Sequence, residues 1–253
     1  MESLQNNVVN NPTILAGMSH EMRTYMNSIV AFSYLMKENS YSNSEREEFS
    51  NHIFSACEQL MQLFDSFLDS AKIDTGNSKT EARICSLENL LDELVPEFKG
   101  MIKKESDSGL DLFIDIKVSN SVKAFIDQKM IFRIIRGLFQ NSVRNTRSGY
   151  IRIGLSPNCN KINFYVLDSG HSYDKYKEFL NTEDMNESLA LHNDTYTAIN
   201  ITLVKKLINI LGGTIWIERN DIEGSGIYFS IPARIIAGSH ACINDNVYST
   251  IVF

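Results

Sequence analysis

The sequence has little of what marks several protein classes. Its four cysteines lie far apart with no CxxC pair, which argues against a disulfide framework and a zinc site. Lysine and arginine (24) are outnumbered by aspartate and glutamate (31), so a nucleic-acid partner is not expected. No apolar run approaches about 18 residues, and the start MESLQNN lacks a signal-peptide pattern. We expect a cytoplasmic chain, attached to a membrane only through segments outside it.

The first part of the chain has the pattern of a helical hairpin. With 253 residues, 43% of them apolar, the length suffices for two packed domains. Apolar residues recur at spacings of three and four over residues 14–36 and again over 49–67, with a polar segment at 38–44 between them. The second helix has a wider apolar face because it also carries Phe54, Phe64 and Leu68. Two hairpins paired as a dimeric four-helix bundle would bury that face.

A second domain begins where the periodicity changes. We divide the chain into domains 1–78 and 79–235 and an unassigned tail, 236–253. The polar residues up to Glu81 are a linker or a short connecting strand. The pattern predicts helices at 87–104, at 127–144 and up to Leu211, and strands at 110–118, 150–155, 161–167, 214–219 and 226–231.

These elements predict an α+β fold class, in which the antiparallel helical hairpin is followed by an α/β sandwich. Residues 169–194 show no clear period, and Gly212 and Gly213 should stop the preceding helix. The apolar end of the chain, 248–253, is either an added strand or the start of a following domain.

The segment SHEMRT, residues 19–24, carries the sharpest chemistry. His20 lies opposite the apolar stripe of the first helix, toward water, and Thr24 shares that face one turn later. A neutral imidazole is a good nucleophile near pH 7, and a carboxylate that takes the proton from its other nitrogen strengthens it. Glu21 is the candidate for that carboxylate. An exposed histidine judged by position alone usually has no function, so the surrounding residues decide.

This segment resembles the phosphoacceptor box of sensor histidine kinases, and the hairpin resembles their dimerisation and phosphotransfer domain. The resemblance implies that His20 accepts the γ-phosphoryl group of ATP, with Glu21 as base, and passes it to an aspartate on a response regulator. In that family the position of Thr24 orients a water that dephosphorylates the regulator, so a phosphatase activity is also implied. Tyr25 replaces the usual proline, so we expect a straighter, less mobile helix.

The second domain resembles the ATP-binding domain that these kinases share with Hsp90, gyrase and MutL. Residues 138–144, LFQNSVR, match the family's asparagine-containing helix. The match implies that Asn141 holds Mg²⁺ and that Arg144 replaces a lysine near the phosphates. An earlier asparagine of this helix is Gly137 here, which supplies no ligand.

The segment VLDSGHS, residues 166–172, resembles the first glycine box of the same domain. The resemblance implies that Asp168 accepts a hydrogen bond from the adenine amino group and that Gly170 lets the backbone approach the ring. Ser172 stands in place of the second glycine. ATP and Mg²⁺ are therefore the implied cofactors.

The glycines that close on the phosphates are missing. Tyr196, Ala198 and Asn200 stand where the family has three glycines, and no glycine occurs between residues 170 and 212. Side chains there obstruct the approach of main-chain N–H groups to a triphosphate. We therefore expect weak binding of ATP and Mg²⁺ and slow autophosphorylation.

Three functions remain open from the sequence. The first is the transmitter region of a sensor histidine kinase, a homodimer that phosphorylates His20 and exchanges the group with a response regulator receiver domain. The alternative is a pseudokinase-like scaffold that docks a regulator with little or no use of ATP. The third is a helical dimer joined to a repurposed ATPase-like fold, against which the intact phosphoacceptor box argues. Nucleotide binding distinguishes the first two.

Overall fold

The computed structural model divides the chain into two compact units. One comprises residues 1–78 and 182–199, and the other comprises residues 79–181 and 200–253. No described helix is long and apolar enough to cross a bilayer. The structure describes residues 12–38, 40–75, 80–104, 109–116, 118, 122–158, 160–181, 194–220, 224–236 and 249–252.

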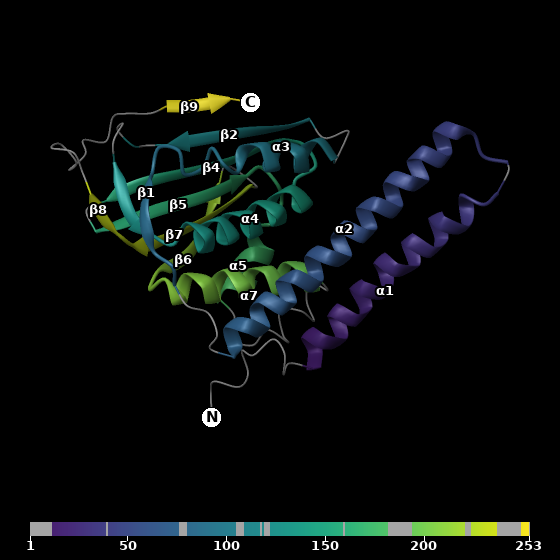
Figure 1. Ribbon diagram of the computed structural model, residues 1–253, viewed down its shortest axis with the longest axis horizontal. Coiled ribbons are helices and arrows are strands. Elements are labelled where there is room, and N and C mark those ends of the chain that lie inside the picture. The colour runs from purple at the N-terminus through teal and green to yellow at the C-terminus, as the bar shows by residue number, and fades with distance from the viewer. Residues whose placement is uncertain are drawn as a thin grey trace. The chain divides into compact units, whose positions relative to one another are not determined.

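The first unit is built on the predicted helical hairpin (Figure 1). Helix α1 spans Pro12–Leu35 and helix α2 spans Asn43–Asp74. A capping box starts α2, because the Ser42 hydroxyl accepts the Glu45 N–H and the Glu45 carboxylate accepts the Ser42 N–H. The guanidinium of Arg46 donates to three backbone carbonyls between the helices. These bonds fix the point at which the hairpin turns.

The apolar stripe of α1 is buried close to the predicted register. Leu15 is 39% exposed and Ile14 is buried in its place, while Met18 and Tyr25 are buried as expected. The ring of Phe32 stacks on His52 of α2, with centroids 4.5 Å apart. Helix α1 runs unbroken through Tyr25, in agreement with the absence of proline there.

The second unit is an α/β domain with two sheets. Strand order is β6-β7-β5-β4-β2-β9 in the larger sheet and β1-β3-β8 in the smaller. The strands are β1 (Arg83–Ser86), β2 (Leu110–Ile116), β3 (Lys123–Ile126), β4 (Gly149–Asn158), β5 (Lys161–Asp168), β6 (Thr214–Asn220), β7 (Gly224–Pro232), β8 (Arg234–Ile236) and β9 (Ser249–Val252). The helices are α3 (Val95–Lys104), α4 (Gln128–Asn145), α5 (Tyr173–Asn181) and α7 (Thr195–Ile210), the last belonging to this unit from Asn200 onward.

Helices α4 and α5 pack on one face of the larger sheet (Figure 1). Strands β2 and β4 are parallel, whereas β4, β5, β7 and β6 form an antiparallel run. Alternate residues of β5 are buried, as expected of a strand with one face on the core. Phe164 stacks on Phe229 within the sheet, and Phe98 of α3 stacks on Phe139 of α4. Asp127 caps α4 by accepting the Met130 N–H.

Several predicted elements differ from the structure. The helix expected from Leu87 begins only at Val95, and residues 88–94 form turns. Pro96 explains this difference, because proline has no N–H and is tolerated only in the first turn of a helix. Strands β1 and β3 and helix α5 were not predicted.

The ends of the second unit agree with the sequence. Gly212 has a φ of 69°, and the N–H groups of Gly212 and Gly213 bond back to carbonyls of α7, so this pair stops the helix as predicted. Strand β9 pairs antiparallel with β2. Residues 249–252 of the apolar segment are therefore an added strand on the edge of the larger sheet.

Candidate functional site

His20 lies on the exposed side of α1. Its side chain and that of Thr24 are both exposed. The Thr24 hydroxyl donates to the backbone carbonyl of His20 at 3.1 Å, and the Ser19 hydroxyl donates to the carbonyl one turn earlier. Both hydroxyls therefore bond to the helix itself and leave the imidazole accessible from solvent.

Glu21 is half-buried and bonds within the first unit, which includes residues 182–199. Its Oε1 accepts the backbone N–H of Tyr196 at 3.1 Å, at the first turn of α7. Asp194 caps the same turn, because its carboxylate accepts the N–H and the hydroxyl of Thr197 at 3.0 and 2.9 Å. Two carboxylates thus cover N–H groups that the family resemblance assigns to phosphate. The role of Glu21 as a base for His20 stays a prediction.

Asp168 ends β5 and is 1% exposed. Its Oδ2 accepts the hydroxyls of Ser142 and Ser225 at 3.0 and 2.8 Å, and its Oδ1 accepts the Gly170 N–H at 3.0 Å. Burial raises the pKa of the Asp168 carboxyl, and these hydrogen bonds oppose the rise. Sequence reasoning missed Ser142 and Ser225. Ser142 follows Asn141 in the asparagine helix and Ser225 lies between two glycines, but nothing local connects either with Asp168.

Gly170 lies against the end of α4. A Cβ at this position would come within 2.6 Å of the backbone oxygen of Asn145, so only glycine fits so close to the helix. The backbone carbonyl of Ser172, the residue in place of the second glycine, accepts the Tyr176 N–H at the start of α5. The turn from β5 to α5 is therefore packed directly against the end of the asparagine helix.

Asn141 is fully buried in α4. Its Oδ1 accepts a hydrogen bond from Asn200 Nδ2 of α7 at 3.4 Å, and its Nδ2 is buried without a hydrogen-bond partner among the described residues. Arg144 is exposed in the last turn of the same helix. The structure thus brings Asn141, Asp168 and Gly170 together around one end of α4, through Ser142, which neighbours Asn141 and bonds Asp168.

Comparisons with known proteins identify relatives of both the helical hairpin and the chain as a whole. Residues 13–76 match the His Kinase A (phospho-acceptor) domain family. The chain is a homologue of the sensor histidine kinases. It is 26% identical over 225 residues to the signal transduction histidine-protein kinase BarA of Escherichia coli, and 23% identical over 232 residues to the autoinducer 2 sensor kinase/phosphatase LuxQ of Vibrio parahaemolyticus. These alignments cover 86% and 87% of this chain but only 24% and 26% of the relatives, so the chain spans about a quarter of their length.

The fold is also that of solved histidine kinases. The structure of kinase ThkA in complex with response regulator protein TrrA aligns with a TM-score of 0.59 at 20% sequence identity. The alignment covers 91% of this chain and 64% of that one. At this identity the likeness concerns the fold, a helical hairpin followed by an α/β domain.

The residues of this histidine kinase homologue fit ATP and Mg²⁺ unevenly. A carboxylate has about four acceptor positions, and that of Asp168 already accepts the hydroxyls of Ser142 and Ser225 and the backbone N–H groups of Gly170 and Ser225. An adenine amino group would therefore have to take the place of one of these bonds. The metal end of the candidate nucleotide site, at Asn141, does not fit Mg²⁺ in this arrangement. Asn141 is 0% exposed and its side-chain oxygen accepts a hydrogen bond from the amide of Asn200. The described residues contain no cluster of three or more His, Cys, Asp and Glu that could hold a metal ion.

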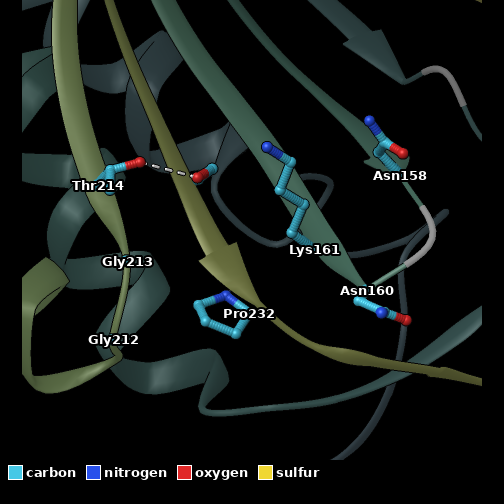
Figure 2. A pocket seen from close by; sticks show the side chains of 8 residues that line it. Asn158, Asn160, Lys161, Gly212, Gly213, Thr214 and Pro232 are labelled. Atoms are coloured by element: carbon cyan, nitrogen blue, oxygen red, sulfur yellow. Dashed lines mark hydrogen bonds between the residues drawn. The ribbon is translucent and has the colours of Figure 1, made fainter.

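An open hollow of about 380 Å³ lies elsewhere in the second unit (Figure 2). Thr214 and Ser230, paired neighbours on β6 and β7, form a hydrogen bond of 3.0 Å in its wall. Lys161, which lines it, begins β5, whereas Asp168 ends that strand, about 23 Å away at the usual strand rise. The hollow is therefore not the nucleotide site. Its lining is formed by Asn158, Asn160, Lys161, Gly212, Gly213, Thr214, Ser230 and Pro232.

Proposed function

We propose that this chain is the transmitter region of a sensor histidine kinase and that His20 carries the phosphoryl group. The single observation that carries this proposal is the exposed His20 in a segment that matches a phospho-acceptor domain. A nucleophile that must meet a separate protein has to lie on the surface, and His20 does. A cytoplasmic location follows from this proposal, since receiver domains are the partners.

The proposed partner is an aspartate on a receiver domain of a response regulator. In the transfer, the phosphorus–nitrogen bond to the imidazole breaks as a phosphorus–oxygen bond to the aspartate carboxylate forms. The imidazole nitrogen keeps the electron pair and takes up a proton when the group has left. The solved complex of ThkA with the response regulator TrrA supports a partner of this class.

Phosphatase activity on the regulator is the proposed reverse output. Thr24 lies one turn from His20 on the same exposed side, and its hydroxyl oxygen keeps acceptor capacity for a water while it donates to the His20 carbonyl. Such a water would attack the aspartyl phosphate of a docked receiver domain. The printed name of the relative LuxQ, a sensor kinase/phosphatase, supports this pair of activities.

The source of the phosphoryl group is where this chain departs from an ordinary kinase. ATP is the donor that the family implies, with Asp168 and Gly170 at its adenine end and Arg144 near its phosphates. The burial of Asn141 and its hydrogen bond to Asn200 support weak binding of Mg²⁺ and ATP and slow autophosphorylation. The same observation favours a second candidate, a scaffold that docks a regulator with little use of ATP.

We propose further that the chain is a homodimer through its helical hairpin. A single hairpin leaves large apolar side chains of both helices in water, which a monomer rarely does over a continuous face. A four-helix arrangement would cover them. The exposed set is Met26, Val30, Tyr34, Phe54, Met61, Phe64 and Leu68.

The proposed function is tested by following the phosphoryl group. The chain is mixed with a labelled phosphoreceiver domain or a small phosphodonor, and an acid-labile, base-stable label is measured on wild type, His20→Gln and His52→Gln. His52 is the matched control, an exposed histidine on α2 of the same hairpin. We expect label on wild type and His52→Gln and none on His20→Gln. Label that survives His20→Gln places the acceptor elsewhere.

A further inference from the structure

Helices α4 and α7 approach each other closely at Asn141. Asn200 and Val204 are four residues apart on α7, and Gly137 and Asn141 are four apart on α4, so each pair lies on one helix face. Asn200 contacts Asn141, and a Cβ on Gly137 would lie 3.3 Å from the Val204 side chain. The lack of a side chain at Gly137 therefore lets α7 pack onto α4 along two successive turns.

The amide of Asn141 is only half satisfied in this arrangement. Its oxygen has the single bond from Asn200, and its buried Nδ2 has no hydrogen-bond partner in the part of the chain that the structure describes. A buried donor left unpaired is costly, and an apolar side chain would pack in that place without the cost. Helix packing thus does not explain why an asparagine stands at position 141. A second conformation, in which its amide binds a ligand, would explain it.

We infer that α7 acts as an internal plug on the metal end of the nucleotide site, and that Asn200 is the residue that holds the Asn141 oxygen away from Mg²⁺. This inference rests on the proposed role of Asn141. Mg²⁺ requires near-octahedral geometry and usually keeps several waters, and a side chain that is 0% exposed beneath a packed helix provides no room for them. The contact is autoinhibitory, because Asn200, which replaces a family glycine, bonds to the same Asn141 oxygen that would coordinate Mg²⁺.

The plug makes nucleotide binding depend on a conformational step. The Asn141 oxygen is available only in the fraction of molecules in which the Asn200 side chain has turned away from it, and the apparent affinity falls by that fraction. Removing the Asn200 side chain should raise the fraction and free the Asn141 oxygen at the same time. The gain should require Mg²⁺, since the Asp168 carboxylate bonds to Ser142, Ser225 and Gly170, whereas Asn200 bonds to the proposed metal ligand Asn141.

The experiment measures binding of ATP to the whole chain by calorimetry, with Mg²⁺ and with a chelator. The variants are Asn200→Ala, Asn200→Ser and the control Asn209→Ala, an exposed asparagine on the same helix. We expect Asn200→Ala to bind about tenfold more tightly with Mg²⁺, the scale of one good hydrogen bond. Asn209→Ala should match wild type. The gain should vanish with chelator and in the double variant Asn141→Ala/Asn200→Ala.

Two outcomes overturn the inference. Unchanged affinity in both folded Asn200 variants, checked by circular dichroism, removes the plug. An equal gain without Mg²⁺ shows that the effect does not act through the metal end. Failure of the proposed function is separate, because transfer from a phosphoreceiver domain to His20 needs no nucleotide. A chain without that transfer but with the Mg²⁺-dependent gain would keep the plug and lose the proposed function.

Discussion

The two units of this chain differ in the exposure of their candidate functional residues. In the first, the side chains of His20 and Thr24 are exposed, and the hydroxyls of Ser19 and Thr24 bond to the helix backbone. In the second, Asn141 and Asp168 are buried and already bonded to other side chains. A surface nucleophile is ready to meet a receiver domain, whereas a buried ligand must first be uncovered. Under the proposed function, phosphotransfer is therefore the activity that needs no rearrangement, and nucleotide use is the activity that does.

The largest expected effect comes from removing the buried Asp168 carboxylate of the second unit. Asp168→Ala leaves two hydroxyls and two backbone N–H groups without their acceptor, so the second unit should lose about 3 kcal/mol of unfolding free energy. The measurement is urea unfolding followed by fluorescence of Trp216, the only tryptophan of the chain, which lies on β6. Asp111→Ala, an exposed aspartate on β2, is the control and should change little. Equal losses in the two variants would contradict the structural role of Asp168.

The next effect concerns the face of the hairpin that is proposed to dimerise. Phe54 is 69% exposed, so Phe54→Asp should leave a single hairpin folded. In a dimer the change buries an unpaired charge, and we expect the dimer dissociation constant to rise about a hundredfold, or about 3 kcal/mol. Light scattering across a concentration series measures this, with Asn51→Asp on the same helix as the charge control. A wild-type chain that is monomeric at high micromolar concentration would rule out the dimer.

A smaller effect tests what holds the hairpin connection. Ser42→Ala removes the hydroxyl that accepts the Glu45 N–H, and the loss of such a cap costs about 1 kcal/mol. Thermal unfolding followed by far-ultraviolet circular dichroism measures it, and Ser40→Ala, an exposed serine before the cap, serves as control. No difference between the two variants would show that Arg46 alone fixes the turn.

The smallest effect is a pH dependence of the same cap. Hydrogen bonds from the Ser42 backbone and hydroxyl lower the pKa of the Glu45 carboxyl below its usual 4.5. A lowered folded-state pKa means that the contribution is present above 4.5 and is lost as the pH falls through the folded value. Wild type should therefore lose slightly more helix stability than Glu45→Gln on acidification below that value. A parallel response of the two proteins would argue against the bond.

The sequence correctly predicts the features that depend on local apolar periodicity, such as the long helices and the faces they expose. The exposure of His20 follows from the apolar stripe of α1, and the start of α4 follows from its cap, Asp127. Local patterns also mislead: the apolar residues after Leu87 suggested a helix that Pro96 postpones. Strands β1 and β3, of four residues each, are too short to show a period.

The site of the second unit depends on contacts that no local pattern reveals. Asp168 is held by serines 26 and 57 residues away in sequence, and Asn141 contacts Asn200, 59 residues away. The family resemblance identified the candidate residues, but Asn141 contacts α7 and Asp168 bonds to Ser142 of α4 and Ser225 of β7. The loss of glycine at position 200 predicted crowding, and the structure identifies Asn141 as the residue that is crowded.

The most direct measurement compares two sources of phosphoryl group for His20 in one preparation. Label is followed on the chain from a phosphoreceiver domain and, separately, from γ-labelled ATP with Mg²⁺, with His20→Gln as the blank. The account predicts that label from the receiver accumulates at least about tenfold faster, because only the ATP route must wait for the Asn200 side chain to release Asn141. Label from ATP that appears as fast as, or faster than, label from the receiver would contradict it.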